Sequence, residues 1–379
     1  MRRTQSLIVI SAVCVCVSVL AGQEKKPVTT PADIIKIMES SSKTYRIESL
    51  DKLKPEEQKD LLGSLFPPVC PAVTSPRLVV KDGNPSVEEF SFKPEAVAII
   101  KKAEEKYGEK SYEEARRIYE QALVADPDCY LAVADIGDCY YFGGQPEKAL
   151  AEYEKAIRMN PQDHRLFFFR ANAQLALGRI EEARKSYIHS LMLRPRYSYA
   201  LQVIEARRDV LKMKIREPFF HPPVLVRKEG EDIVVYCDLA KGPHWLAYAN
   251  AKAVWLGEPS HRREVAGSEA AGWSSSEERE CLKHLLAVYA TRADKAATVD
   301  PDLELLQKVA EAGDLDYFIL YEIYTRLCPT GLLTLSEDIQ KEMERFIETY
   351  FVIDIQGSLP FGVGSEGRED GSWSEHCPV

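Results

Sequence analysis

The stretch DIGDCYYFGGQPEKALAEYEKAIRMNP at residues 135–161 decides the fold of the central part of the chain. Gly143 and Gly144 can take the positive φ values of a tight turn, and Pro146 suits the first turn of the helix that follows. Pro161 cannot continue that helix, because proline has no backbone N–H group to donate. The stretch therefore predicts a helix, a tight turn, a second helix and a stop.

The same pattern occurs three times with a period of 34 residues, from about Ala96 to Pro195. Four columns keep this period: Ala115, Ala149 and Ala183; Tyr119, Tyr153 and Tyr187; Ala122, Ala156 and Ser190; Pro127, Pro161 and Pro195. Within a unit the small residues, such as Gly137, fall where two helices must approach closely. Such self-similarity is typical of a repeat array, in which each unit stacks on its neighbours because it cannot bury its apolar face alone.

This pattern resembles the tetratricopeptide repeat (TPR) family over about 100 of the 379 residues. The first unit is the least typical, since Ala103 replaces the usual glycine and Lys110 stands where the later units have Gly144 and Gly178. The resemblance implies a mainly α fold, a TPR helical-hairpin array at 93–214. Its last helix, at 198–213, is expected to be a cap with a polar outer end formed by Arg207, Arg208, Asp209 and Lys212.

In proteins that the array resembles, the first helix of each unit lines a concave surface that holds a peptide or a partner's helix. Register carries this protein-binding role to Tyr107, Leu131, Asp138, Tyr141, Phe142, Arg165, Phe168, Asn172, Leu175, Tyr199 and Gln202. Aromatic and polar side chains together are typical of recognition surfaces, although some of these aromatic residues can instead pack in the core, as Phe167 and Tyr140 are expected to do. Of the residue types with which one family variant clamps a terminal carboxylate, only Arg165 and Asn172 are present, so that ligand class is disfavoured.

The first 22 residues have the order of a secretory signal peptide. Arg2 and Arg3 precede an apolar run at 7–20, and short side chains precede Gly22. The run is shorter than the roughly 20 residues that span a bilayer, and Cys14 and Cys16 lack a lipoprotein context. We therefore expect an exported protein, periplasmic or extracellular, with no membrane span after cleavage.

The net charge disfavours one class of partner, and the number and spacing of the cysteines disfavour a metal site and a disulfide framework. The net charge is −10, and it becomes −12 without the two arginines of the signal segment, which disfavours nucleic acid as a partner. The seven cysteines that would remain are odd in number and none is spaced as a metal-ligand pair: Cys70, Cys129, Cys139, Cys237, Cys281, Cys328 and Cys377. Their apolar neighbours favour buried structural thiols over a disulfide framework.

The rest of the chain divides around the repeats. An N-terminal extension at 23–92 contains two short helices and a short strand, predicted at 31–38, 55–65 and 77–80, and can lie along the repeats. After Pro218, strands at 224–227 and 232–237 predict a β-hairpin with Gly230 in its turn. Helices are expected at 244–256, 276–292, 301–312, 315–327 and 336–351. These elements predict a mostly helical domain with a small β-hairpin at 218–355, and the polar composition of 356–379 predicts a disordered tail.

No stretch carries the chemistry of a recognised enzyme. Phosphate loops, dinucleotide turns in a strand-turn-helix context and nucleophile elbows are missing from the sequence, so we assign no catalytic, cofactor-binding or metal-binding residues. Asp135 and Asp138 share a helix face inside the repeats, and Asp138 can face the concave surface. We therefore favour an adaptor or scaffold that binds another protein. The alternatives are an unrecognised enzyme at 218–354 recruited by the repeats, or a structural subunit of an envelope assembly.

Overall fold

The computed structural model describes residues 29–291 and 299–355, so the predicted signal peptide and the predicted disordered tail lie outside the described residues. The described part divides into two units. The repeat unit comprises 74–77, 88–215 and 351–355, and the mixed unit comprises 29–73, 78–87 and 216–350. Within these described ranges, no helix combines the length and the apolar character that crossing a membrane requires.

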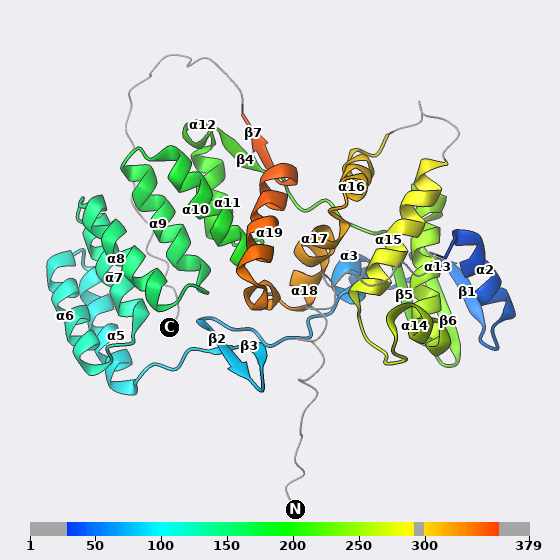
Figure 1. Ribbon diagram of the computed structural model, residues 1–379, viewed down its shortest axis with the longest axis horizontal. Coiled ribbons are helices and arrows are strands. Elements are labelled where there is room, and N and C mark those ends of the chain that lie inside the picture. Colours follow the sequence, from blue (N-terminus) through cyan, green and yellow to red (C-terminus); the bar gives the residue numbers. More distant parts are fainter. Residues whose placement is uncertain (1–28, 292–298, 356–379) are drawn as a thin grey trace, which may run out of the picture. The chain divides into compact units, whose positions relative to one another are not determined.

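The repeat unit is built from antiparallel pairs of helices that stack one after another (Figure 1). The pairs are α5 (Pro94–Gly108) with α6 (Tyr112–Ala125), α7 (Tyr130–Phe142) with α8 (Pro146–Met159), and α9 (His164–Ala176) with α10 (Ile180–Leu193). Successive pairs also pack through α6 against α7 and α8 against α9. The predicted mainly α fold with a helical-hairpin array is confirmed.

The columns of small residues and tyrosines form the core between these helices. Ala149 and Tyr153 are buried, and a Cβ atom added at Gly137 would lie 2.6 Å from Cε1 of the Tyr153 ring. Only glycine therefore lets α7 and α8 approach as closely as they do. The turns explain two further positions, since Gly144 has a φ of 73° and Lys110, its equivalent in the first unit, has a φ of 59°. A left-handed conformation is unfavourable for lysine, which accounts for the glycine in the later units.

The capping segment consists of two short helices and a strand rather than the predicted single helix. They are α11 (Ser198–Ala206), α12 (Arg208–Leu211) and β4 (Met213–Ile215). Lys212 is left-handed, with a φ of 52°, and so ends the helical part. Strand β4 then pairs in antiparallel fashion with β7 (Val352–Asp354), where Asp354 also accepts a hydrogen bond of 2.6 Å from Arg184. No sequence pattern near β4 indicates this pairing, because β7 lies far away in the chain.

The mixed unit begins with most of the predicted N-terminal extension. Its elements are α2 (Pro31–Ser40), β1 (Tyr45–Ser49), a 3₁₀ turn (Leu50–Lys52), α3 (Pro55–Lys59) and α4 (Leu61–Leu65). Strand β1 pairs in parallel with β6 (Asp232–Cys237), which pairs in antiparallel fashion with β5 (Val224–Glu229). These residues therefore join the later part of the chain, whereas 74–77 and 88–92 of the predicted extension belong to the repeat unit. The reason is that β6 is buried and needs a hydrogen-bonding partner on both edges.

Helices follow the hairpin, as predicted, and α13 packs on strands β5 and β6. They are α13 (Pro243–Gly257), α14 (Pro259–Ala266), α15 (Ser275–Ala290), α16 (Pro301–Glu311), α17 (Leu315–Phe318), a π-helical stretch (Ile319–Tyr324), α18 (Thr325–Leu327) and α19 (Glu337–Tyr350), with 3₁₀ turns at Leu239–Lys241 and Gly331–Thr334. The hairpin and the five predicted helices are confirmed, whereas α14 was not predicted. A further two-stranded sheet consists of β2 (Pro76–Lys81) and β3 (Asn84–Glu89).

One disulfide joins Cys70 to Cys328 inside the mixed unit, across 258 positions of sequence. The backbone N–H groups of Val69 and Cys70 also donate to the carbonyl of Leu327, at 2.8 and 3.2 Å. The prediction of free buried thiols is therefore wrong for Cys70 and Cys328, whose distant pairing no local spacing indicates. It is confirmed for the other four cysteines of the described ranges: Cys129, Cys139, Cys237 and Cys281. The disulfide holds the N-terminal segment to the end of α18.

Candidate functional site

Four aromatic side chains gather where α5, α6 and α7 meet at their turns, and we call them the aromatic patch. They are Tyr107, Tyr112, Tyr141 and Phe142. The ring centroids of Tyr107 lie 5.5 Å from Tyr112 and 6.0 Å from Phe142, and those of Tyr141 and Phe142 are 5.2 Å apart. Phe142 is 48% exposed, although a phenylalanine in a monomeric protein is more often buried. The patch therefore offers apolar surface to solvent.

Two carboxylates, Asp135 and Asp138, stand on the same helix as part of this patch, and we call them the acidic pair. Asp138 precedes Tyr141 and Phe142 by three and four positions, and Asp135 precedes Asp138 by three, so all of them lie on one face of α7. Both carboxylates are half-buried. The acidic pair and the aromatic patch thus form one continuous strip.

The surroundings of the acidic pair disfavour its negative charge. Burial raises the pKa of Asp138 to about 7, and a hydrogen bond from the Tyr153 hydroxyl opposes this rise. Burial also raises the pKa of Asp135 well above its usual range, with repulsion from Asp138 and Glu104 adding to the effect. Both side chains nevertheless retain some exposure to solvent.

The third repeat contains a matched position for comparison. Asn172 lies 34 residues after Asp138, and its Oδ1 atom accepts a hydrogen bond of 2.5 Å from the hydroxyl of Tyr187. The Tyr153 hydroxyl donates to Asp138 in the same way. A neutral amide therefore satisfies the tyrosine as well as a carboxylate does, and the charge at 138 is not needed for this contact.

Arg165 and Phe168, predicted to face the concave surface, are instead each only 8% exposed. Nε of Arg165 donates to Oδ1 of Asp163 at 2.9 Å, and its Nη2 donates to Ser75 Oγ at 3.1 Å. Phe168 packs in the core of the third repeat, 6.1 Å from the Tyr187 ring. Both are corrected to packing residues: Ser75 of the segment 74–77 contacts Arg165, and the ring of Phe168 lies 5.5 Å from that of Tyr197 before the capping helix, which repeat register alone could not show.

The other predicted positions differ in how far solvent reaches them. Leu131 and Leu175 are half-buried and pack against the cores of their repeats. Tyr199 is 41% exposed on α11, and Gln202 is exposed one turn later. These two stay candidate contacts at the capping end of the array.

Sequence reasoning missed two contributors to this surface. Tyr112 begins the second helix of its unit, so a rule based on first helices passes over it. Arg207 is exposed between α11 and α12; burial raises the pKa of Tyr141, and the positive charge of Arg207 lowers it. Because a single continuous capping helix was predicted, Arg207 was assigned to the outer end of the cap and not to this surface. Asp138 acts on Tyr141 as well and raises its pKa, so Arg207 and Asp138 influence the same ring in opposite senses.

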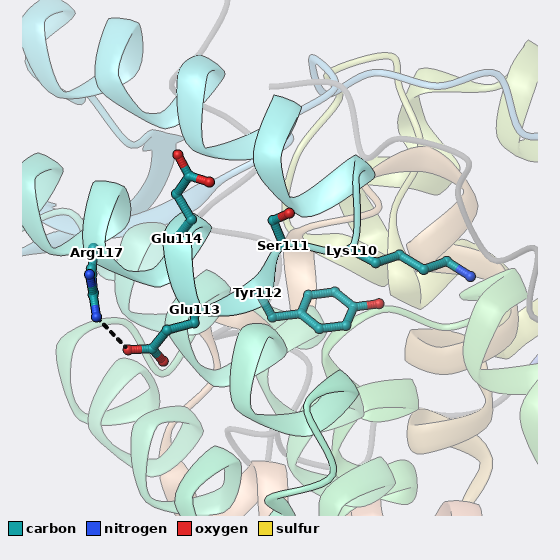
Figure 2. A pocket seen from close by; sticks show the side chains of 6 residues that line it. All are labelled: Lys110, Ser111, Tyr112, Glu113, Glu114 and Arg117. Carbon is teal, nitrogen blue, oxygen red and sulfur yellow. Dashed lines mark ion pairs between the residues drawn. The ribbon is translucent and has the colours of Figure 1, made fainter.

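A hollow at the start of α6 shares Tyr112 with the aromatic patch, and Figure 2 shows its lining side chains. They are Lys110, Ser111, Tyr112, Glu113, Glu114 and Arg117. Tyr112 projects toward the same side as Lys110, while Glu113 and Arg117 pair with each other at 3.5 Å. Each lining side chain is half-buried or exposed. The hollow therefore lacks a buried polar group that would position a ligand, and we take the strip as the candidate site.

The mixed unit contains buried polar networks that hold its helices together. Glu280 accepts hydrogen bonds from Trp255 Nε1 at 2.5 Å and from His261 Nε2 at 2.8 Å, which joins α13, α14 and α15. Lys252 pairs with Glu277 at 2.7 Å and with Glu278. In the part of the chain that the structure describes, no group of three histidine, cysteine or acidic side chains is arranged to hold a metal ion. We assign these networks a structural role.

Comparison with known proteins concerns the same central residues. A family model described as tetratricopeptide repeat matches residues 106–165 and 143–196. Tetratricopeptide repeat protein 8 of Caenorhabditis elegans is 29% identical over 116 residues, which cover 29% of this chain and 22% of that protein. The chain thus spans about a fifth of the length of this curated relative.

Two solved structures also match about a third of the chain. The first TPR of Spaghetti (RPAP3) bound to the HSP90 peptide SRMEEVD has 23% identity and a TM-score of 0.29, covering 31% of this chain and 92% of that chain. The type III secretion chaperone SycD of Yersinia enterocolitica in complex with a peptide of the translocator YopD has 19% identity and a TM-score of 0.29, covering 32% and 92%. The repeat columns, the stacked helix pairs and the family model agree over one segment. Residues 106–196 of this chain are tetratricopeptide repeats.

Proposed function

We propose that this protein is an adaptor that binds another protein or a peptide through the concave side of its repeats. The aromatic patch carries this proposal, because it exposes clustered rings from three helices. Aromatic side chains are enriched among the residues that dominate binding energy at interfaces. The neighbouring carboxylates add polar groups that can orient a partner. A binding surface of this kind needs no catalytic group.

The proposal includes export, so that the adaptor acts in the periplasm or outside the cell. The order of charged, apolar and small residues at 1–22 supports this, as does the disulfide between Cys70 and Cys328. Disulfides form and persist in oxidising compartments and are rare where thiols are kept reduced. The order of residues at 1–22 and the disulfide therefore both favour an oxidising compartment, the periplasm or the outside of the cell.

The experiment that tests the adaptor function compares two sets of variants. The full chain, tagged and immobilised, captures proteins from envelope extract in its wild-type form and with Tyr141→Ala and Phe142→Ala together. We expect the double variant to lose the captured partner, since truncating an interface aromatic residue often costs about 2 kcal/mol or more. The matched control is Val124→Ala, which removes an apolar side chain that is 84% exposed on α6 outside the patch. Equal capture by all three proteins would show that the patch is not the binding surface.

A further inference from the structure

We propose that the strip binds an extended segment of a partner protein in which a lysine or arginine lies close to an apolar or aromatic residue, with the acidic pair receiving the positive charge. This inference rests on the proposed adaptor function and specifies the chemistry of its partner. Asp138 is the residue that receives the cation. Burial raises the pKa of both carboxyls, and a cation bound beside Asp138 favours their ionised forms. Phe142 and Tyr141 receive the apolar side chain.

The first argument is that the acidic pair has no counter-charge of its own. Within the described ranges, neither carboxylate forms an ion pair, and the hydroxyl of Tyr153 that donates to Asp138 is neutral. Arg165 acts weakly on Asp135, but its guanidinium is engaged with Asp163 and Ser75. A half-buried charge without a partner is unfavourable, and an incoming cation relieves it.

The second argument is that the fold does not require a charge at this position. Asn172 takes the place of Asp138 in the next repeat and accepts the same tyrosine hydrogen bond. An asparagine at 138 would satisfy Tyr153 without the burial of a charge at 138 and without the repulsion that the Asp138 carboxylate exerts on Asp135. The carboxylate is thus an unfavourable choice for structure, which indicates a role in recognition.

The third argument concerns the neighbouring rings. A guanidinium or ammonium group is attracted to the faces of aromatic rings, and its aliphatic stem packs on apolar surface. Tyr107 lies beside Asp138, whose negative charge adds to the effect of burial in raising the pKa of Tyr107. A cation held by Asp138 therefore meets aromatic surface as well. Carboxylates of a partner, by contrast, would be repelled by the acidic pair.

The spacing of the strip limits the partner's sequence. Asp138 and Phe142 are four positions apart on α7, which is about 6 Å along the helix axis. An extended chain advances about 3.3 Å per residue, and its alternate side chains share a face. The partner's cation and its apolar anchor are therefore expected about two residues apart.

A displayed library of random heptapeptides, selected on the immobilised full chain, tests this inference. We expect the wild type to enrich peptides with lysine or arginine within three positions of an apolar or aromatic residue. Synthetic versions of these peptides should bind about tenfold more weakly to Asp138→Asn and to Asp135→Asn. The matched control is Asp128→Asn, an exposed carboxylate in the loop before α7, which should bind within about twofold of wild type.

The outcomes separate this inference from the adaptor function. Suppose that Phe142→Ala abolishes binding of the enriched peptides. The cation preference alone is then overturned if these peptides lack a cation, if they carry acidic residues instead, or if they bind Asp138→Asn as well as wild type. Peptides that bind irrespective of Phe142, or no enrichment at all, overturn the adaptor surface together with the inference. Circular dichroism of each variant confirms that the repeats are folded, and the agreement of two independent asparagine variants guards against a folding defect in one.

Discussion

Replacing Asp138 with asparagine should make the protein more stable at alkaline pH. Burial raises the pKa of this carboxyl from 3.8 to about 7 in the folded protein. The folded state therefore binds more protons than the unfolded state between these two values, and the free energy of unfolding falls as the pH rises through them. The destabilisation is complete above about pH 7 and disappears at strongly acidic pH. Asparagine does not titrate, so the Asp138→Asn variant does not lose stability in this way as the pH rises.

The magnitude follows from the size of the shift. Each pKa unit corresponds to about 1.36 kcal/mol, so a rise of roughly three units sets an upper limit of about 4 kcal/mol. Because Asp138 is half-buried, solvent screening reduces this figure, and we expect about 2 kcal/mol at pH 8. A change of 1 kcal/mol moves the melting temperature of a unit of this size by about 2–4 °C. The Asp138→Asn variant should melt about 4–8 °C higher, with the Asn172 contact as structural precedent.

Differential scanning calorimetry of the full chain at several values between pH 4 and pH 8.5 measures this effect, because calorimetry can separate the transitions of the two units. The stabilisation of Asp138→Asn over wild type should shrink as the pH falls from about 7 toward 4. Asp128→Asn is the control and should show no such trend. A variant less stable than wild type at pH 8.5, or a stabilisation that does not change with pH, would refute the reasoning.

Three further predictions concern the fold and the export of the chain. Gly137→Ala should destabilise the repeat unit by about 1–3 kcal/mol, because the added methyl group overlaps the tyrosine ring behind it, and urea denaturation followed by circular dichroism would measure the loss. Replacing Cys70 and Cys328 with serine should destabilise the mixed unit by about 2–5 kcal/mol by releasing a long closed loop, and calorimetry should show only that unit's transition shifted; an unchanged transition would contradict this. N-terminal sequencing of exported protein should find Gly22 or Gln23 first, whereas an intact first methionine would rule out cleavage.

The part of the site that the sequence predicted depends on repeat register. A period of 34 residues places Asp138, Tyr141 and Phe142 on the first helix of the second unit, and all three lie half-buried or exposed there. The same rule placed Arg165 and Phe168 on this surface, where they are buried. Repeat register indicates which face of a helix points away from the partner helix of the same repeat. It does not indicate whether another segment of the chain covers that face.

What the sequence by itself determined was the local structure: helix pairs, turns at Gly144 and Gly178, and the small residue at 137. These depend on the backbone preferences and close contacts of residues near one another in the chain, so they recur visibly with the repeat. What only the tertiary structure decided joins distant residues. Tyr45 pairs with Ile233 on a parallel neighbouring strand of a mixed sheet, and Cys70 bonds to a cysteine 258 positions away. Such contacts are selected by the burial and hydrogen bonding of the whole unit, and no short stretch of sequence specifies its own distant partner.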